Sequence, residues 1–367
     1  MPVKINRDRL QNLLTDLVDI YSPSGKEEEI IEYLRNYLEL SGIVVQKQVV
    51  SEDRYNLILL SGKEPPPVVM VGHVDTVPAF DYDNYRSDLD ENILYGLGSA
   101  DMKGGCAAMV EAFLSFRQSY PDHDFPAALA LVVGEEETGD GAIALCRDFR
   151  FNWAVIGEPT DLKACFAHFS YVEIALTTRG KRSHASVSRP GQNAVKNMLD
   201  LLNILIEHVE QHKSDILYNV RDMQSSQAGF AAPDFCTAYL DLHMPTQYSI
   251  GELTAELEEM VESRMEGDRK QFSLSTIHNG YRLPLRGEMA RVIESAFHNA
   301  ELDFNADTFR SDSDAPLLWQ SGIKPVVLGP GHLSVAHTNE ESISVPQVID
   351  AARLYLGLLE ELAGVNA

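Results

Sequence analysis

Apolar positions along this chain follow two patterns, a helical repeat of three to four residues and short runs without interruption. The first helical repeat begins after Asn6, which is placed to cap it, and its apolar stripe is Leu10, Leu13, Leu14 and Leu17. Uninterrupted runs are typical of strands buried on both faces, and they occupy Val68–Val71, Ala127–Val133 and Trp153–Ile156. Runs and repeats alternate as far as residue 160, so the pattern predicts a mostly parallel sheet flanked by helices.

The pattern changes near Tyr171 and returns near Pro284. Between these points we expect strands and helices at Val172–Thr177, Asn193–Glu207, Cys236–His243, Glu252–Met265 and Phe272–Ile277. Their order suggests a small α+β sandwich inserted into the larger α/β domain. The larger domain is therefore predicted to comprise residues 1–171 and 284–367, and the inserted domain residues 172–283.

Two local features of the N-terminal region are also predicted. Ile43–Val45 and Asn56–Leu60 have the short apolar character of strands. Ser24, followed three residues later by Glu27, forms a capping-box pattern at the start of a second helix.

The charge balance narrows the possible partners. The 367 residues include 55 Asp and Glu and 30 Lys and Arg, a formal net charge of −25 at pH 7. Such an acidic chain is a poor match for nucleic acid or an anionic membrane. The four cysteines form no Cys-x-x-Cys pair, and we find neither a signal-peptide core nor an apolar run of membrane-spanning length. These features predict a cytoplasmic protein with reduced thiols.

His73 and Asp75 follow directly after the run Val68–Val71. Side chains two residues apart in an extended chain point the same way, so the imidazole and the carboxylate are expected side by side at a strand end. A metal-ligating histidine commonly passes its second ring N–H to a carboxylate, and this His-x-Asp pattern could supply such a pair. The pattern is weak alone, because a surface histidine near a turn aspartate is more common.

Other candidate ligands also stand after predicted strands. They are Asp101 in a Gly-rich loop, the pair Glu136 and Glu137, Glu158 and His337. Each has an ordinary explanation as a turn former, a solvated helix start or a surface histidine. Because the carboxyl ends of parallel strands meet at one edge of a sheet, all of them could converge there.

Five segments then occur in a recognisable order. They are Gly72–Pro78, Gly98–Gly105, Glu135–Thr138, Ile156–Thr160, and Gly329–Gly331 with His337. Together they resemble the family of co-catalytic zinc amidohydrolases and metallopeptidases that includes acetylornithine deacetylase, succinyl-diaminopimelate desuccinylase, aminoacylase and glutamate carboxypeptidase. The likeness covers nearly the whole chain and looks closest to the acetylornithine deacetylase branch. It implies a zinc-peptidase-like catalytic domain with an inserted dimerisation or lid domain.

The resemblance implies a role for each candidate ligand. His73 and Glu158 would bind one metal ion, Glu137 and His337 the other, and Asp101 would bridge the two. Donors of this kind suit two Zn²⁺ ions per subunit, and Co²⁺ or Mn²⁺ could substitute. Two metals that share a carboxylate lie ~3.5–4 Å apart. Such a pair activates a water molecule and also polarises a carbonyl group.

Two more acids would act without binding metal. By the resemblance, Asp75 would orient His73, and Glu136 would be the general base that moves the proton of the attacking water. The family usually has Asp-Glu-Glu where this chain has Glu135–Glu137, and a register shifted by one residue is the alternative.

The inserted domain adds candidates for substrate binding. His184 and Asn193 match a lid segment that, in the family, places its histidine in the partner subunit's site to hold the developing oxyanion, which implies a homodimer. Asp234 stands where the family often has a basic group for the substrate carboxylate, and this favours a cationic substrate. Arg310 is the candidate for another carboxylate anchor, although it could equally pair with neighbouring acids at the surface.

The resemblance predicts an enzyme that hydrolyses the amide bond of an N-acyl amino acid, with arginine biosynthesis as one setting. Gly329 and Gly331 complete the predicted substrate-binding set. The alternatives are a dipeptidase or aminopeptidase, a succinyl-diaminopimelate desuccinylase-like enzyme, and an inactive homologue that serves as a binding scaffold. The complete ligand set argues against the scaffold.

Overall fold

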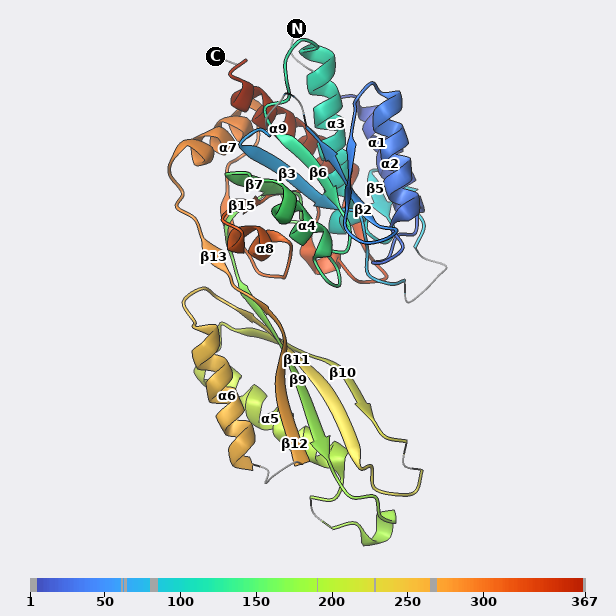
Figure 1. Cartoon of the computed structure of the whole chain (residues 1–367), viewed down its shortest axis with the longest axis vertical. Coiled ribbons are helices and arrows are strands. Elements are labelled where there is room, and N and C mark those ends of the chain that lie inside the picture. The colour runs from blue at the N-terminus through green and yellow to red at the C-terminus, as the bar shows by residue number, and fades with distance from the viewer. Residues whose placement is uncertain are drawn as a thin grey trace. The chain divides into compact units, whose positions relative to one another are not determined.

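The structure is a computed structural model that describes residues 5–60, 62, 65–79, 85–189, 191–227, 229–264 and 269–365. The chain divides into two compact units (Figure 1). Unit 1 contains Met1–Ala167, Leu283–Phe309 and Ser313–Ala367, and unit 2 contains His168–Arg282 and Arg310–Asp312. The sequence placed its two boundaries after residues 171 and 283.

A central sheet forms the framework of unit 1. Its strands lie in the order β1-β2-β6-β3-β7-β15-β8, with β14 paired to β8. In that order their bounds are Gln46–Val49, Tyr55–Leu59, Ala128–Val132, Val68–His73, Trp153–Ile156, Lys324–Val327, Ala164–His168 and, for β14, Ala306–Phe309. The central strands β6, β3, β7 and β15 run parallel, whereas β2 and β8 on either side are antiparallel to them. The predicted mostly parallel sheet is confirmed, and β3 is buried along its whole length, as its unbroken apolar run requires.

Helices cover this sheet. They are α1 (Arg7–Asp19), α2 (Glu28–Leu40), α3 (Gly104–Ser119), α4 (Asp140–Asp148), α7 (Glu288–Asn299), α8 (Ala315–Gln320) and α9 (Val345–Ala363). α3 packs against α1 and α9, and α9 also packs against α7, whereas α4 packs against α8. The predicted cap of α1 is confirmed, because the Asn6 side chain accepts a hydrogen bond from the backbone N–H of Arg9. The predicted apolar stripe of α1 is buried.

A small antiparallel sheet lies beside the Gly-rich loop. Its strands are ordered β16 (Ser342–Ser344), β5 (Ile93–Tyr95) and β4 (Asp88–Asp90). A short helical turn, Ser99–Lys103, then leads from the Gly-rich loop into α3. The pairing of β16 with β5 brings the segment after His337 next to this loop.

Unit 2 is a sheet backed by two helices, and it confirms the predicted inserted α+β fold. The sheet is antiparallel with the order β10 (Leu217–Ser225), β11 (Phe235–Met244), β9 (Ser170–Arg179) and β12 (Lys270–His278). Alternate residues of β9 are buried against α5 (Ala194–His212) and α6 (Ile250–Arg264), where they form one apolar core. β13 (Tyr281–Arg282) ends the main segment of this unit.

Three local predictions differ from the structure. The strand expected at Ile43–Val45 is β1, which begins three residues later because Ile43 turns inward after α2. The capping box is wrong, because Ser24 donates to Asp75 instead of capping a helix. The sequence also missed β10, whose residues are all exposed and therefore carry no buried alternation. The predicted end of α6 at Met265 lies outside the described residues.

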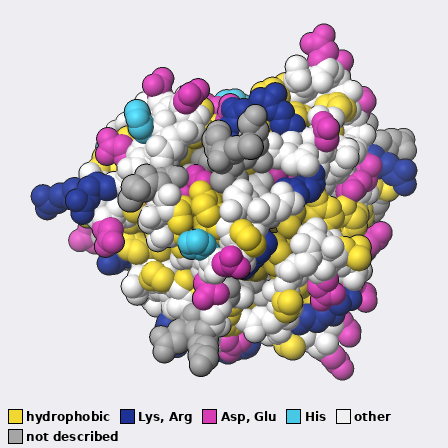
Figure 2. Space-filling model, turned by 90° about the horizontal axis from the view of Figure 1, so that it is seen from above, with side chains coloured by type: hydrophobic (Ala, Val, Ile, Leu, Met, Phe, Trp, Pro, Cys, Tyr) yellow, Lys and Arg dark blue, Asp and Glu magenta, His cyan; other side chains and the backbone are white. Residues whose placement is uncertain are grey.

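Charged side chains are spread over the surface. On the face shown in Figure 2, Asp and Glu side chains alternate with Lys and Arg, and no continuous basic patch is visible there. Within the described ranges, every helix is too short or too polar to span a bilayer.

Candidate active site

The ends of the parallel strands bring the candidate ligands of unit 1 together. His73 is the last residue of β3, Glu135 and Glu136 lie in the turn after β6, and Glu158 follows β7. Asp101 stands in the turn that precedes α3. This is the edge at which open α/β sheets place their sites, and His337 reaches it from the loop before β16.

Two groups of metal donors share Asp101. In the first, His73 Nε2 lies 3.2 Å from Asp101 Oδ1 and 3.6 Å from Glu158 Oε1. In the second, His337 Nε2 lies 3.4 Å from Asp101 Oδ2 and 3.0 Å from Glu136 Oε2. Asp101 therefore presents one carboxylate oxygen to each group.

The two histidines are surrounded by negative charge. Burial lowers the pKa of His73, but the charges of Glu135 and Glu158 outweigh burial and raise the pKa well above its usual value. Burial also lowers the pKa of His337, yet the hydrogen bonds with Asp101 and Glu136 raise it to about 11. Both imidazoles thus lie where a positive charge is strongly favoured.

The carboxylates respond to the same crowding. Burial, together with the charge of Asp101, raises the pKa of Glu158 to about 8, and burial likewise raises the pKa of Glu135 and of Glu136. Burial alone would raise the pKa of Asp101, but hydrogen bonds from His337 and His73 lower it below its usual range. Four acids packed into one buried site repel each other, and cations placed between them would relieve that repulsion.

Two buried oxygens at this site indicate that metal ions fit it. Within the described part of the chain, Glu136 Oε1 and Glu158 Oε1 are buried and have no hydrogen-bond partner. A buried acceptor without a partner is costly, and these two oxygens belong to the two donor groups that share Asp101. Imidazole nitrogens and carboxylate oxygens are donors that divalent zinc accepts.

Asp75 differs from its expected role. The Nδ1–H of His73 donates to the backbone carbonyl of Asp75 at 3.0 Å, whereas the Asp75 carboxylate lies 3.6 Å from that nitrogen. The carboxylate accepts hydrogen bonds from Ser24 Oγ and from the backbone N–H groups of Glu135 and Glu136. β3 ends at His73, so the alternation of an extended strand does not continue to Asp75. Asp75 orients His73 through its backbone and holds the glutamate turn through its side chain.

The register of the glutamates also differs by one residue from the expected one. Glu137 is exposed and belongs to none of the donor groups among the described residues. Glu136 lies with Asp101 and His337, and Glu135, whose Oε2 lies 3.7 Å from His73 Nε2, forms a further possible donor group with His73 and Glu136. The cause is a tight turn that starts at Gly134, which has a φ of +75°, and that directs the third glutamate outward.

The glycines predicted to bind substrate have structural partners. A Cβ on Gly329 would lie 2.2 Å from the Gly157 carbonyl oxygen, so only glycine lets the two loops meet beside Glu158. The backbone N–H of Gly329 donates to Thr160, and that of Gly331 donates to the Gln347 side chain. Substrate binding by Gly329 and Gly331 stays a prediction. It would have to involve atoms other than their backbone N–H groups, which already donate within the protein.

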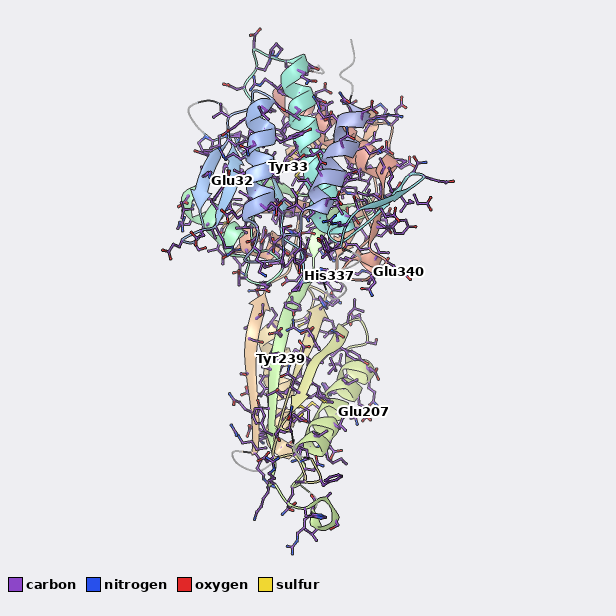
Figure 3. All side chains as sticks on the ribbon, turned by 90° about the vertical axis from the view of Figure 1, so that its right-hand side faces the viewer. Glu32, Tyr33, Glu207, Tyr239, His337 and Glu340 are labelled. Atoms are coloured by element: carbon purple, nitrogen blue, oxygen red, sulfur yellow. The ribbon has the colours of Figure 1, made fainter. Side chains whose placement is uncertain are left out.

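A small hollow that is open to solvent lies beside His337 in unit 1. Its walls are largely apolar, and its lining includes Val77, Pro78, Tyr85 and Leu97. Thr338, Asn339 and Glu341 close it from the His337 loop. Figure 3 shows His337 and Glu340 close together in this loop. The imidazole of His337, at the edge of the hollow, is half-exposed.

The remaining predicted residues belong to unit 2. His184 is exposed, and its Nδ1 lies 2.8 Å from Ser186 Oγ. The Asn193 side chain caps α5 by accepting from the Lys196 N–H, and Arg310 is exposed. Asp234 Oδ1 accepts from Ser226 Oγ, which lowers the pKa of the acid. Their roles toward substrate stay predictions.

Two polar residues that support the site were not predicted from the sequence. Ser24 holds Asp75, and Glu341 binds backbone N–H groups of the Gly-rich loop. Glu341 follows His337 by four residues, and this spacing is the one signal that could have found it. In a chain with 55 acidic residues, such spacing does not distinguish a functional acid from a solvated one.

Comparison with known proteins agrees with this geometry. The sequence model described as Peptidase family M20/M25/M40 matches residues 69–361. The chain is 30% identical to an acetylornithine deacetylase of Photorhabdus laumondii over 92% of this chain and 91% of the relative. It is 33% identical to a probable succinyl-diaminopimelate desuccinylase of Staphylococcus epidermidis over 55% of this chain and 52% of the relative. A tripeptidase from Staphylococcus aureus has the same fold, with a TM-score of 0.81, 20% identity and coverage of 98% of this chain and 99% of the other.

Proposed function

We propose that this chain removes an acyl group, most readily an acetyl group, from the nitrogen of an amino acid. The chain belongs to peptidase family M20/M25/M40 and is a metal-dependent hydrolase, and the proposal starts from this premise. The observation that carries the proposal is the pair of donor groups that share Asp101, with the Glu135 carboxylate beside them. The relative named acetylornithine deacetylase supports this choice of reaction, because the match spans nearly the whole of both chains.

Each donor group would hold one zinc ion in this proposal. His73 and Glu158 would bind one ion, Glu136 and His337 the other, and Asp101 would bridge them. Bound there, the pair of ions would polarise the scissile carbonyl and lower the pKa of a water molecule, and Co²⁺ or Mn²⁺ could take the place of zinc.

Glu135 is the proposed general base. Its side chain is 13% exposed, and its Oε2 faces the ligand His73 at 3.7 Å. Its backbone N–H is fixed by Asp75, so the carboxylate has a defined position. Glu135 would accept the proton from the attacking water and then donate it to the nitrogen of the leaving amine.

Unit 2 would complete the site as a lid and as the dimer contact. In this proposal His184 of one subunit helps to hold the developing oxyanion in its partner's site. Asn193 and Arg310 would position the substrate. The four cysteines are free, which supports a reducing compartment such as the cytoplasm, and arginine biosynthesis is the setting proposed for the reaction.

A second candidate reaction is removal of a succinyl group. It is favoured by the 33% identity to the probable desuccinylase, although that match covers only 55% of this chain. Hydrolysis of dipeptides is a third possibility that the shared fold leaves open.

A substrate screen with the zinc-loaded protein tests the proposal. N-acetyl, N-succinyl and dipeptide substrates are compared, and we expect the N-acetyl amino acids to turn over fastest. The Asp101→Asn variant is the control, because it removes the shared ligand and should lose both metal and activity. If the wild-type protein binds two metal ions but hydrolyses none of these substrates, the result would favour the inactive scaffold over the hydrolase.

A further inference from the structure

Glu341 is a buried acid whose carboxylate accepts three hydrogen bonds from backbone N–H groups. It is 3% exposed and lies four residues after His337. Its Oε1 accepts hydrogen bonds from the N–H of Ala100 at 3.0 Å and of Asp101 at 3.1 Å. Its Oε2 accepts from the N–H of Gly98 at 3.0 Å.

These hydrogen bonds join two segments that carry ligands of the same proposed metal ion. Asp101 and His337 are two of the three residues in the second donor group, and their side chains meet at 3.4 Å. The backbone of Glu341 adds another tie, because its carbonyl accepts from the N–H of Gly96. The separation of the two ligands is thus determined by a short strap that runs from His337 to Glu341.

We infer that Glu341 is a positioning residue that holds the Asp101 backbone at a fixed distance from His337, and so favours binding of the metal ion on the His337 side. The inference rests on the proposed function, since it assumes the two-metal arrangement. The Asp75 carboxylate holds the glutamate turn in the same way, because it accepts hydrogen bonds from the backbone N–H groups of Glu135 and Glu136.

The two metal sites should depend on Glu341 to different degrees. The first donor group uses Asp101 together with His73 and Glu158, which are held by other parts of the chain. His73 is fixed by β3, and Glu158 by the close contact of Gly157 with Gly329. Loosening the strap therefore disturbs one ligand of the first group and two of the second.

Glu341→Gln is the informative substitution. An amide has the shape of a carboxylate but only one accepting oxygen, so its NH₂ group would face either the Gly98 N–H or the N–H groups of Ala100 and Asp101. Glu340→Gln is the matched control, because Glu340 is the exposed neighbour on the same strap (Figure 3). Both substitutions replace a carboxylate by an amide on the same strap, but within the described part of the chain only Glu341 contacts the Gly-rich loop through its side chain.

Metal-free proteins are titrated with Zn²⁺ against a chelator, and with Co²⁺ while the visible absorption bands are recorded. For Glu341→Gln we expect the ion on the His337 side to lose about 10–100-fold in affinity, the loss typical for residues that support metal ligands, while the other ion changes little. Excess metal should restore kcat with little change in KM. Glu340→Gln should match the wild type in all these measurements.

Two results would overturn the inference. One is a folded Glu341→Gln protein that binds both ions as the wild type does. The other is an equal loss of both ions, which would indicate general damage to the site. If the wild type binds no metal, the proposed function fails first, and the two failures are thereby distinguished.

Hydrogen exchange of the metal-free wild type tests the strap without any substitution. If Glu341 holds the loop, the peptide that covers residues 96–103 exchanges slowly before metal is added. Rapid exchange of this peptide in the folded metal-free protein would overturn the inference even if Glu341→Gln failed to fold.

Discussion

Replacing the three consecutive glutamates one at a time with glutamine distinguishes three expected roles: a metal ligand, a general base, and a residue with no part in the site. Glu136 supplies one of three donors around His337 and Asp101, so Glu136→Gln should reduce the bound metal from two ions toward one. Glu135 is the proposed base, so Glu135→Gln should keep both ions while kcat falls by ~10²–10⁴, equal to about 2.7–5.4 kcal/mol of activation free energy. Glu137 is exposed, and Glu137→Gln should change stability and activity by no more than about 0.5 kcal/mol.

The assay combines elemental analysis of metal per subunit with steady-state kinetics on an N-acetyl amino acid. Thermal unfolding of each metal-free variant serves as the control for folding. Loss of metal in Glu137→Gln, together with two retained ions and a low kcat in Glu136→Gln, would refute the placement of these residues. That result would support the register expected from the sequence.

Three further outcomes are expected. Gly329→Ala places a Cβ 2.2 Å from the Gly157 carbonyl oxygen, so the free energy of unfolding in denaturant should fall by about 1–3 kcal/mol. Gly251→Ala is the control and should leave this free energy unchanged, because no atom lies within 4 Å of the new Cβ. Equal effects of the two substitutions would contradict the close contact. If His184 acts in the partner's site, refolding inactive His184→Ala and Glu135→Gln subunits together should restore roughly a quarter of wild-type activity, and mixed dimers without activity would exclude this role. Asp234 stands where a basic group is expected, so kcat/KM should be higher for an acyl-ornithine than for an acyl-glutamate, and the reverse order would refute the charge argument.

The sequence was sufficient to predict the sheet, the insertion and the ligand-bearing loops, because these depend on long apolar runs and on the order of motifs. It could not determine which two of the three consecutive glutamates point inward. That choice depends on the turn at Gly134 and on the N–H groups held by Asp75, both of which are properties of the backbone. The hydrogen bonds of the Asp75 carboxylate to the glutamate turn could not be predicted from alternation, because the strand ends at His73.

Ser24 illustrates the same limit. Its spacing to Glu27 matches a local capping motif, but its partner is Asp75, 51 residues away in the chain. A pattern within four residues cannot reveal competition from a distant acceptor. The hydroxyl instead reaches the network that holds the glutamate turn.

The insertion of unit 2 has a consequence for biosynthesis. Unit 1 draws its inner strand β15 and the candidate ligand His337 from residues that are translated after His168–Arg282 of unit 2. A nascent chain that ends at Ala167 has β7 without its parallel neighbour β15, and it has no His337. Folding of unit 1 must therefore wait while more than a hundred intervening residues emerge from the ribosome, a high contact order that slows folding and prolongs exposure to aggregation. In the proposed two-metal site, the ion on the His337 side could bind only after the segment that carries His337 had emerged and folded.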